Sequence, residues 1–305
     1  MKASKFGKVL LPFITPFDKN GDVAYDTFAK LIDYAIEKDY LDTVIVTETT
    51  GEFNTLSAAE SKAIYKTAVK AVDGRCPIIA GTGAASTREA IELTNAAVDA
   101  GINTVMIVGP YYCKPTQQGI YNHYMEILNN TTADILIYNI PIFTGMNIEP
   151  ETVGRLAAQS KRFIGIKDES GINPVQIIDY KYAVEKYNPD FLLYNGDDIM
   201  IMPTLACGAD GVVSGGSLLI GDKVRKIFKL YEEGKNDEAF ELYQYAFKLC
   251  RLFGINGRIH PNPMLRAAVE MVSGIEVGPA RPPLDVPTAE EMEALTKVLT
   301  DLNLL

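Results

Sequence analysis

The sequence has few of the residues on which metal and redox sites depend. Its 305 residues include only two histidines, His123 and His260, and four cysteines. The cysteines lie far apart, without the close pairs of a zinc or thioredoxin-type site, so we expect them to be reduced and structural. Each histidine is isolated in the sequence, which favours a structural or surface role. We therefore expect no metal site and no histidine-based triad.

Long apolar runs and basic runs are also missing. No stretch approaches the roughly 18 uninterrupted apolar residues of a transmembrane helix, and residues 1–7 show no signal-peptide pattern. The 29 basic residues are outnumbered by 39 acidic ones, and no basic run could neutralise a phosphate backbone. We expect a cytoplasmic protein with neither a membrane nor a nucleic acid as partner. The 47% hydrophobic content is that of an ordinary compact globular protein.

Short apolar runs rich in valine and isoleucine alternate with longer segments of helical periodicity, as in βαβ units on a parallel sheet. The predicted strands are Lys8–Ile14, Thr43–Thr47, Pro77–Gly81, Thr104–Val108, Ile135–Asn139, Phe163–Lys167, Phe191–Asn195 and Gly211–Ser214. The predicted helices between them are Tyr25–Lys38, Ser57–Val72, Ser86–Ala100, Gln117–Asn129, Glu149–Gln159, Pro174–Tyr187, Ile199–Cys207 and Ile220–Glu233. Eight units in a row favour a closed (β/α)8 TIM barrel over an open doubly wound sheet.

Local signals support this pattern and suggest where the barrel ends. Ser57 and Ser86 each stand three residues before a glutamate, which predicts a capping box at the start of two helices. After residue 233 the alternation stops and only helical patterns follow. We expect a barrel with the active site over 1–233 and a C-terminal helical region over 234–305.

Catalytic groups of such a barrel lie where the strands end and the βα loops begin. Lys167 ends an apolar run, which places its amine against the barrel interior. A free lysine amine has a pKa of roughly 10.4, burial can lower such a pKa by ~3 units, and a neutral amine can form a Schiff base with a carbonyl. The structural alternative is a surface lysine that pairs with Asp168 or Glu169.

Other strand ends offer partners for this chemistry. Tyr138 brings a phenol to the same end of the barrel, and a tyrosine held by hydroxyl neighbours can relay protons. Thr49 and Tyr112 are candidate neighbours, although strand-end tyrosines also serve as amphipathic filling. The turn at 49–52 offers hydroxyls and backbone N–H groups suited to the carboxylate of a 2-oxo acid. No glycine fingerprint for a nicotinamide cofactor opens a helix after a strand.

At these residues the chain resembles, from end to end, the dihydrodipicolinate synthase/N-acetylneuraminate lyase family of class I pyruvate aldolases. The resemblance rests on six motifs in order, namely TTGE at 49–52, AGTGA at 80–84, PYY at 110–112, YNIP at 138–141, GIKD at 165–168 and RPPL at 281–284. It implies a homotetrameric barrel without metal or organic cofactor. It also implies that Lys167 forms a Schiff base with pyruvate or a pyruvate-derived product.

The resemblance implies roles for the other motif residues as well. Tyr138 is expected to donate and accept the proton, with Thr49 and Tyr112 as its relay partners. Tyr112 is expected to reach the site of a neighbouring subunit. Thr50 and the backbone at Val213 are expected to hold the 2-oxo acid.

One departure from the family pattern concerns the second substrate. The synthase branch carries an arginine two residues after the proline of the YNIP motif, where it binds the carboxylate of aspartate semialdehyde, and this chain has Phe143 there. A neutral ring cannot replace a bidentate cation. The chain is therefore more similar to members that cleave neutral-tailed 2-keto-3-deoxy sugar acids. We expect an aldolase of the 2-keto-3-deoxygluconate type, which yields pyruvate and an aldehyde.

Further departures lie near the expected site. Sialate lyases bind the polyol tail through an Asp-Glu pair after strand 7, and here Asp198 is followed by isoleucine. Glu48 occupies a position where the family usually has a small residue. A carboxylate near Lys167 would favour the ammonium form, so we expect Glu48 to point at substrate hydroxyls, together with Glu169 and Asp198. We place Gly196, which precedes the strand-7 acids, with this substrate-binding set.

Several alternatives remain open on the same scaffold. Within the class they are 4-hydroxy-tetrahydrodipicolinate synthesis from aspartate semialdehyde, sialate cleavage, and dehydration of a keto-deoxy acid on the same Schiff base. Outside it, a catalytically silent barrel could sense a 2-oxo acid. Phe143 argues against the first alternative. The joint presence of Lys167, Tyr138, Thr49 and Tyr112 argues against a silent barrel.

Overall fold

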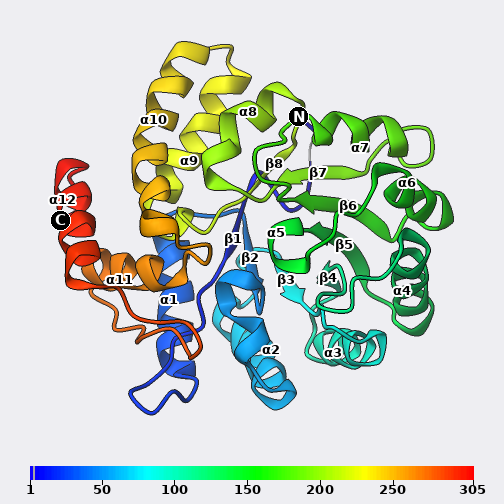
Figure 1. The fold of residues 1–305 in the computed structure, drawn as a ribbon, viewed down its shortest axis with the longest axis horizontal. Helices are drawn as coiled ribbons and strands as arrows, with labels where there is room; N and C mark the ends of the chain where they lie inside the picture. The colour runs from blue at the N-terminus through cyan, green and yellow to red at the C-terminus, as the bar shows by residue number, and fades with distance from the viewer. Residues whose placement is uncertain (3) are drawn as a thin grey trace. The chain divides into compact units, whose positions relative to one another are not determined.

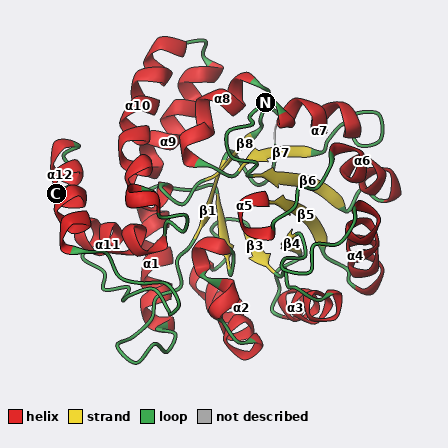
Figure 2. Ribbon diagram, in the orientation of Figure 1, coloured by secondary structure: helices red, strands yellow, loops and turns green. Residues whose placement is uncertain are grey.

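The computed structural model describes residues 1–2 and 4–305; Ala3, within the N-terminal stretch weighed above as a leader, lies outside the described residues. The strands of the described chain form one closed parallel barrel in sequence order, and Figure 2 shows them in yellow among red helices. The strands are β1 Val9–Pro12, β2 Thr43–Val46, β3 Ile78–Gly81, β4 Thr104–Val108, β5 Asp134–Asn139, β6 Phe163–Asp168, β7 Leu192–Asn195 and β8 Gly211–Val213. This confirms the (β/α)8 TIM barrel with C-terminal helices.

The helices follow the predicted alternation. They are α1 Tyr25–Glu37, α2 Ala58–Val72, α3 Thr87–Asp99, α4 Gln117–Asn130, α5 Pro141–Thr144, α6 Pro150–Gln159, α7 Gln176–Val184, α8 Ile201–Ala206, α9 Ser217–Glu232, α10 Asn236–Leu252, α11 Asn262–Ser273 and α12 Ala289–Asp301. Short 3-10 helices are η1 Thr49–Gly51, η2 Phe53–Thr55, η3 Asp198–Met200 and η4 Ile255–Gly257. The sequence predicted neither α5 nor the 3-10 turn η3, which takes the place of the first residues of the predicted helix 199–207.

The two predicted caps have different outcomes. Ser57 and Glu60 form the reciprocal capping box at the start of α2. At α3 the Ser86 hydroxyl accepts the Glu89 backbone N–H, 3.2 Å away, but the return bond of the box is not formed. The prediction of a second capping box was therefore only half right. The Ser86 hydroxyl caps the helix by itself, because it satisfies one terminal N–H group.

By their internal contacts the described residues group into two compact units that interleave along the sequence. The first unit comprises Met1–Lys8 and Pro77–Val213, and the second comprises Val9–Cys76 and Ser214–Leu305. The division at residue 233 that the sequence suggested stays a prediction.

The first unit holds β3 to β8 with the helices α3 to α8. Strands β4 to β7 are buried nearly throughout, as expected for strands covered on both faces. Their register aligns Tyr138 of β5 with Lys167 of β6, and Lys167 with Tyr194 of β7. Outside them α6 packs against both α4 and α7, which Figure 1 shows as neighbouring green helices. The aligned strand ends therefore bring residues from three strands to one edge.

The second unit holds β1, β2, α1, α2 and the helices α9 to α12. Helix α10 lies along α9 (Figure 1). Gly221 of α9 packs on the chain at Tyr40, where a Cβ atom would lie 2.2 Å from the Tyr40 carbonyl oxygen. In the part of the chain that the structure describes, no helix is long and apolar enough to cross a membrane.

Candidate active site

Lys167 lies near the end of β6 with its amine inside the first unit. The residue is only 4% exposed. Its Nζ atom lies 3.1 Å from Oε2 of Glu169 and 3.7 Å from the centroid of the Tyr138 ring. The parallel register of β5 and β6 explains this neighbourhood, because it sets Tyr138 beside Lys167. The structural alternative was right that Lys167 pairs with Glu169 but wrong about the place, since the amine is buried.

Glu169 connects the amine to the phenol. The Tyr138 hydroxyl donates a hydrogen bond of 2.8 Å to Oε2 of Glu169, the same oxygen that faces Lys167. Tyr138 is fully buried, whereas the Glu169 side chain keeps 25% exposure. The Glu169 backbone N–H donates to the carbonyl of Asn139, 2.9 Å away, which ties the loop after β6 to the end of β5. One carboxylate oxygen thus serves both groups that the sequence assigned to proton and amine chemistry.

Asp197 is a titratable neighbour that sequence reasoning did not select. Burial, and then the Glu169 carboxylate, raise the pKa of Asp197 to about 7. The backbone N–H of Ile199, 3.0 Å from Oδ1, and the charge of Lys167 act in the opposite direction. A carboxyl group with this pKa is half protonated at neutral pH, a property that clusters at functional sites. The available signal was the pair of acids directly after β7, from which the sequence analysis chose Asp198.

Gly196 shapes the space beside the amine. A Cβ atom at residue 196 would lie 2.7 Å from Cε of Lys167 and 2.8 Å from Cβ of Glu169. Such distances are too short for carbon atoms, so any side chain there would push both groups away. The Gly196 backbone N–H donates to the Asp168 carbonyl, 2.8 Å away. The role predicted for Gly196 was substrate binding, and the structure adds close packing against the Lys167–Glu169 pair.

A buried polar network fixes the ends of β5 and β6. Asp168 accepts hydrogen bonds from Asn139 at 2.8 Å, from Gln176 at 3.1 Å and from the Ser170 hydroxyl at 2.9 Å. Burial raises the pKa of Asp168, and these three donors oppose that rise. The sequence analysis did not identify this network, although Asp168 follows Lys167 directly. It orients the strand end from which Lys167 projects.

The other predicted residues of the first unit are more scattered. Tyr112 is 93% exposed and adopts a left-handed φ of 69°. Phe143, on the short helix α5, is 37% exposed. Val213 ends β8 and is buried, and Asp198 is the half-buried first residue of η3. The structure thus brings Lys167, Tyr138, Glu169 and Gly196 together and leaves Tyr112 facing solvent.

Three predicted residues belong to the second unit, at the turn after β2. Glu48 is 2% exposed and precedes η1, on which Thr49 and Thr50 lie. The Thr50 carbonyl accepts a hydrogen bond of 2.9 Å from Asn262, and the Gly51 carbonyl accepts one of 2.7 Å from the Thr15 hydroxyl. The turn is therefore fixed by its neighbours. The contacts predicted for Glu48, Thr49 and Thr50 with substrate stay predictions.

A buried ion pair supports this turn. Glu52 adopts a left-handed φ of 55° and is fully buried. Its Oε1 atom accepts from Nε of Arg266 at 2.7 Å and from Asn262 at 3.1 Å, and its Oε2 atom accepts the Arg281 backbone N–H at 2.9 Å. The partners lie more than 200 positions apart in the sequence, which hid the pair from sequence analysis. Glu52 is thus a structural residue of the motif at 49–52.

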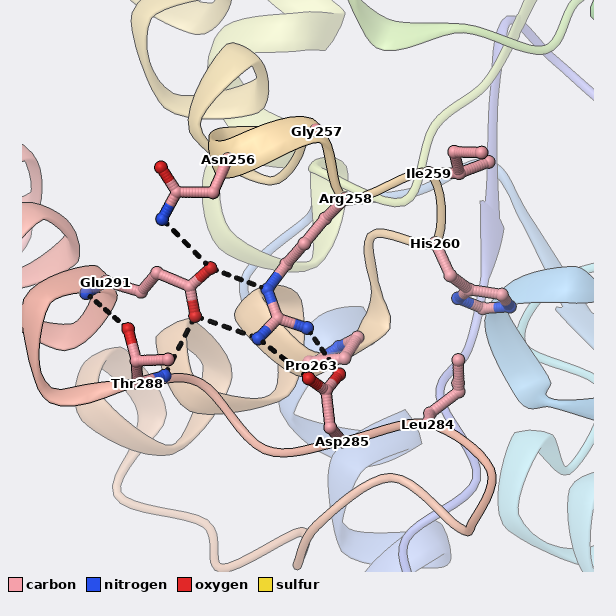
Figure 3. Close-up of a pocket in the computed structure, with 10 residues that line it drawn as sticks. All are labelled: Asn256, Gly257, Arg258, Ile259, His260, Pro263, Leu284, Asp285, Thr288 and Glu291. Carbon is pink, nitrogen blue, oxygen red and sulfur yellow. Dashed lines mark hydrogen bonds and ion pairs between the residues drawn. The ribbon is translucent and has the colours of Figure 1, made fainter.

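A separate pocket of about 470 Å³ lies in the second unit (Figure 3). Figure 3 shows the Arg258 guanidinium between two carboxylates. Its Nε atom lies 2.8 Å from Oε1 of Glu291, and its Nη1 atom lies 2.6 Å from Oδ1 of Asp285. Arg258 holds the pKa of Glu291 down at about 2. Because two carboxylates already neutralise this cation, the lining that Figure 3 labels has little attraction for the carboxylate of a 2-oxo acid.

The histidines show no sign of catalytic placement. His123 is buried on α4, its Nδ1 atom lies 2.9 Å from the Thr87 hydroxyl, and burial lowers its pKa to about 4. Burial also lowers the pKa of His260. In the described part of the chain, no group of three or more histidine, cysteine, aspartate or glutamate residues is arranged to hold a metal ion.

Known proteins resemble this chain over nearly its whole length. Residues 5–302 match the Dihydrodipicolinate synthetase family. The 4-hydroxy-tetrahydrodipicolinate synthase of Bacillus subtilis is 36% identical over 298 residues, covering 97% of this chain and 99% of that protein. A dihydrodipicolinate synthase structure from Cyanidioschyzon merolae with lysine bound is 34% identical, with a TM-score of 0.93 over 99% of this chain and 100% of that one.

A third relative was solved with a 2-oxo acid. YagE, a prophage protein of this family from E. coli K12 in complex with pyruvate, is 26% identical, with a TM-score of 0.91 over 98% of this chain and 99% of that one. Enzymes of this family are carbon–carbon lyases of the pyruvate-aldolase type that use a lysine Schiff base and no external cofactor. Because the family match spans nearly the whole sequence, the chain belongs to the dihydrodipicolinate synthetase family.

Proposed function

We propose that Lys167 forms a Schiff base with pyruvate, to which an aldehyde is joined or from which one is released. The observation that carries this proposal is the buried Lys167 amine beside the Tyr138 phenol, with one Glu169 oxygen in contact with both. A Schiff base withdraws electrons from the former carbonyl carbon, so a proton on the adjacent methyl group can leave and the resulting enamine can attack an aldehyde. In this proposal Tyr138 moves that proton.

For the aldehyde, we propose aspartate semialdehyde as the first candidate. The Bacillus subtilis relative is named 4-hydroxy-tetrahydrodipicolinate synthase and the Cyanidioschyzon merolae relative dihydrodipicolinate synthase, and both align with this chain nearly end to end. These names support the synthase reaction better than the 2-keto-3-deoxygluconate reaction that the sequence favoured, and amino-acid biosynthesis better than carbohydrate metabolism. The sequence preference rested on Phe143 and on the GEF sequence at 51–53.

A neutral-tailed 2-keto-3-deoxy sugar acid is the second candidate, and one observation favours it. The short helix α5 presents Phe143 where the synthase branch has a cation, and Glu169 and Asp197 add carboxyl groups beside Lys167. The carboxylate of aspartate semialdehyde would meet like charge there. Sialate cleavage, keto-deoxy acid dehydration and a silent 2-oxo acid sensor are the remaining outcomes for a substrate panel.

The residue roles follow from this chemistry. We propose Lys167 as nucleophile and Tyr138 as proton donor and acceptor, with Thr49 and Tyr112 as relay partners. The 2-oxo acid is held by Thr50 and the backbone at Val213. The aldehyde end faces Glu48, Phe143, Glu169, Gly196 and Asp198. Because Tyr112 is exposed in the single chain, its role requires a neighbouring subunit, and we propose a cytoplasmic homotetramer, which sedimentation would test.

Borohydride trapping tests the proposal directly. Reduction in the presence of pyruvate should add one pyruvate-derived group, which peptide mass spectrometry should place on Lys167. No adduct on Lys167 would refute the Schiff-base mechanism. Catalytic efficiencies with aspartate semialdehyde, glyceraldehyde and N-acetylmannosamine then rank the candidate substrates, and an adduct without turnover on any of them would point to a sensor.

A further inference from the structure

We propose that Glu169 is the proton carrier of Schiff-base formation. It accepts a proton from the Lys167 ammonium, returns that proton to the hydroxyl group that leaves from the carbinolamine, and remains as the counterion of the iminium. This inference rests on the proposed function, because it requires Lys167 to be the nucleophile. It gives Glu169 a catalytic role in place of the substrate-hydroxyl contact expected from the sequence.

The geometry points to one oxygen atom. Oε2 of Glu169 lies 3.1 Å from Nζ of Lys167 and 2.8 Å from the hydroxyl of Tyr138. Both distances are within the reach of direct proton transfer. The phenol donates its hydrogen bond to this carboxylate. Glu169 therefore links Tyr138 to the Lys167 amine. A proton leaving the amine therefore has an acceptor that also contacts Tyr138.

The backbone holds this arrangement in place. The missing side chain at Gly196 leaves the space that Cε of Lys167 and Cβ of Glu169 occupy. The Glu169 N–H bond to the Asn139 carbonyl fixes the other side of the loop. Carboxylates on flexible surface loops seldom keep such contacts, because ordering the side chain costs entropy. Here the close packing at Gly196 restricts both partners.

The charges around Glu169 favour its role as the base. The groups that face it are Lys167 of β6, Tyr138 of β5, Asp168 of β6 and Asp197 after β7, with Asp198 next to Asp197. The Asp168 carboxylate is engaged by three donors. Burial and Glu169 raise the pKa of Asp197 to about 7, so Asp197 keeps a proton over much of the acidic range. Among these carboxyl groups, Glu169 is therefore the one that we assign as proton acceptor of the Lys167 amine.

The proton balance closes without another reactant. The Lys167 ammonium gives one proton to Glu169, and the neutral amine attacks the pyruvate carbonyl carbon while the carbonyl π pair moves to oxygen. A second proton passes from the new N–H to that oxygen, which gives the carbinolamine. Glu169 returns its proton to the hydroxyl, the carbon–oxygen bond breaks, water leaves, and the nitrogen lone pair forms the C=N bond of the iminium.

This cycle removes an apparent conflict. A carboxylate beside a lysine stabilises the ammonium, which opposes nucleophilic attack. Here an ammonium–carboxylate pair is replaced by an iminium–carboxylate pair, so the same charges face each other before and after the reaction. Stabilisation of the starting amine is therefore matched by stabilisation of the product. Only the steps between them need Glu169 in its protonated form.

The test is the rate of Schiff-base formation with pyruvate in the full-length chain, measured by timed borohydride quenching from pH 5.5 to 9. Glu169→Gln should lower this rate at least about 10²-fold, as expected for loss of a general acid–base group. Glu169→Asp should restore part of the rate. Added formate should accelerate Glu169→Ala. Glu151→Gln, an exposed change on α6, is the matched control.

The outcomes separate this inference from the proposed function. An unchanged rate in Glu169→Gln, with the adduct still on Lys167, would overturn the proton-carrier role and leave the aldolase intact. A lowered rate with no recovery in Glu169→Asp and no rescue of Glu169→Ala by formate would show that Glu169 only positions the amine, which also overturns it. No adduct in the wild-type chain would refute the proposed function itself. Circular dichroism would verify folding, and formate rescue requires a folded Glu169→Ala chain.

Discussion

Two of the ion pairs in the described residues, Arg266 with Glu52 and Lys167 with Glu169, have different surroundings. In the pair of Arg266 with Glu52, both residues are nearly inaccessible and both glutamate oxygens accept hydrogen bonds. Arg266 also donates N–H groups to the carbonyls of Val277, Gly278 and Thr15. In the pair of Lys167 with Glu169, the glutamate keeps 25% exposure and one oxygen serves both the amine and Tyr138.

The difference shows what each pair can do. A guanidinium does not lose its proton in proteins, so a fully bonded arginine pair can only fix structure. A lysine amine exchanges protons and can become a nucleophile. The Arg266–Glu52 pair connects α11 to the turn after β2, whereas the Lys167–Glu169 pair lies at strand ends with a phenol beside it. The first pair should therefore determine stability and the second should determine rate.

Replacing Lys167 should have the largest effect on rate. Lys167→Arg keeps a cation opposite Glu169 but cannot form an imine, so kcat/KM should fall by about 10⁴-fold or more. Its unfolding free energy should fall by no more than about 1–3 kcal/mol, because the ion pair is retained and only the larger guanidinium must be accommodated. Steady-state kinetics and urea unfolding measure the two quantities. Activity within tenfold of wild type would break the comparison.

Replacing Arg266 should reverse that pattern. Arg266→Leu leaves Glu52 buried without its cation, which should cost about 3–5 kcal/mol of unfolding free energy. The double change Arg266→Leu with Glu52→Leu removes both charges and should recover part of that loss. Urea unfolding of the two variants provides the measurement. If the single variant is as stable as wild type, Arg266 is not the structural anchor described here.

A side chain at residue 196 should disturb the Lys167–Glu169 pair and leave the Arg266–Glu52 pair intact. Gly196→Ala places a Cβ atom 2.7 Å from Cε of Lys167, and overpacking of this kind costs about 1–3 kcal/mol. The rate of Schiff-base formation should fall about tenfold as Lys167 and Glu169 shift. Gly254→Ala, where a Cβ atom has no neighbour closer than 3.5 Å, is the control. Equal rates in the two variants would argue against tight packing at Gly196.

Asp197 should show a smaller, pH-dependent effect on stability. Its pKa is raised to about 7 in the folded chain against 3.8 for the free group. The folded state therefore holds a proton that the unfolded state has lost, and stability declines as pH rises from 4 through 7. Between pH 5 and 7, wild type should lose about 2 kcal/mol relative to Asp197→Asn.

The comparison with Asp197→Asn cancels the contribution of His123, which has the opposite sign. Burial lowers the pKa of His123 to about 4, so its contribution is lost as pH falls below about 6.5. Urea unfolding of both chains at the two pH values gives the difference. Parallel stability curves would show that Asp197 does not carry the raised pKa.

The sequence predicted the barrel and the proximity of Tyr138 to Lys167 for physical reasons. Buried parallel strands read as continuous apolar runs, and their carboxyl ends gather at one edge. That rule alone placed Tyr138 and Lys167 together, and the register of β5 and β6 agrees. The turn at 49–52 was also found, because its hydroxyl and glycine residues form a compact motif.

What the sequence could not supply depends on distant contacts. The raised pKa of Asp197 arises from burial and from Glu169, which belongs to another loop. The structural role of Glu52 depends on Arg266, far along the chain. Glu169 was considered only as a substrate contact or a surface partner of Lys167, because a one-dimensional pattern does not show that its oxygen also reaches Tyr138. For the substrate, Phe143 favoured a neutral-tailed sugar acid, whereas the names of the relatives support the synthase reaction better.

Tyr112 offers a way to observe association of the chain. A non-glycine residue with φ of 69° is held in a sparsely populated backbone region, and its ring is 93% exposed in the single chain. The sequence contains no tryptophan, so Tyr112→Trp would introduce a single indole. The fluorescence of this indole would shift to shorter wavelength when another molecule covers the loop. Emission from residue 112 would therefore report association of the chain.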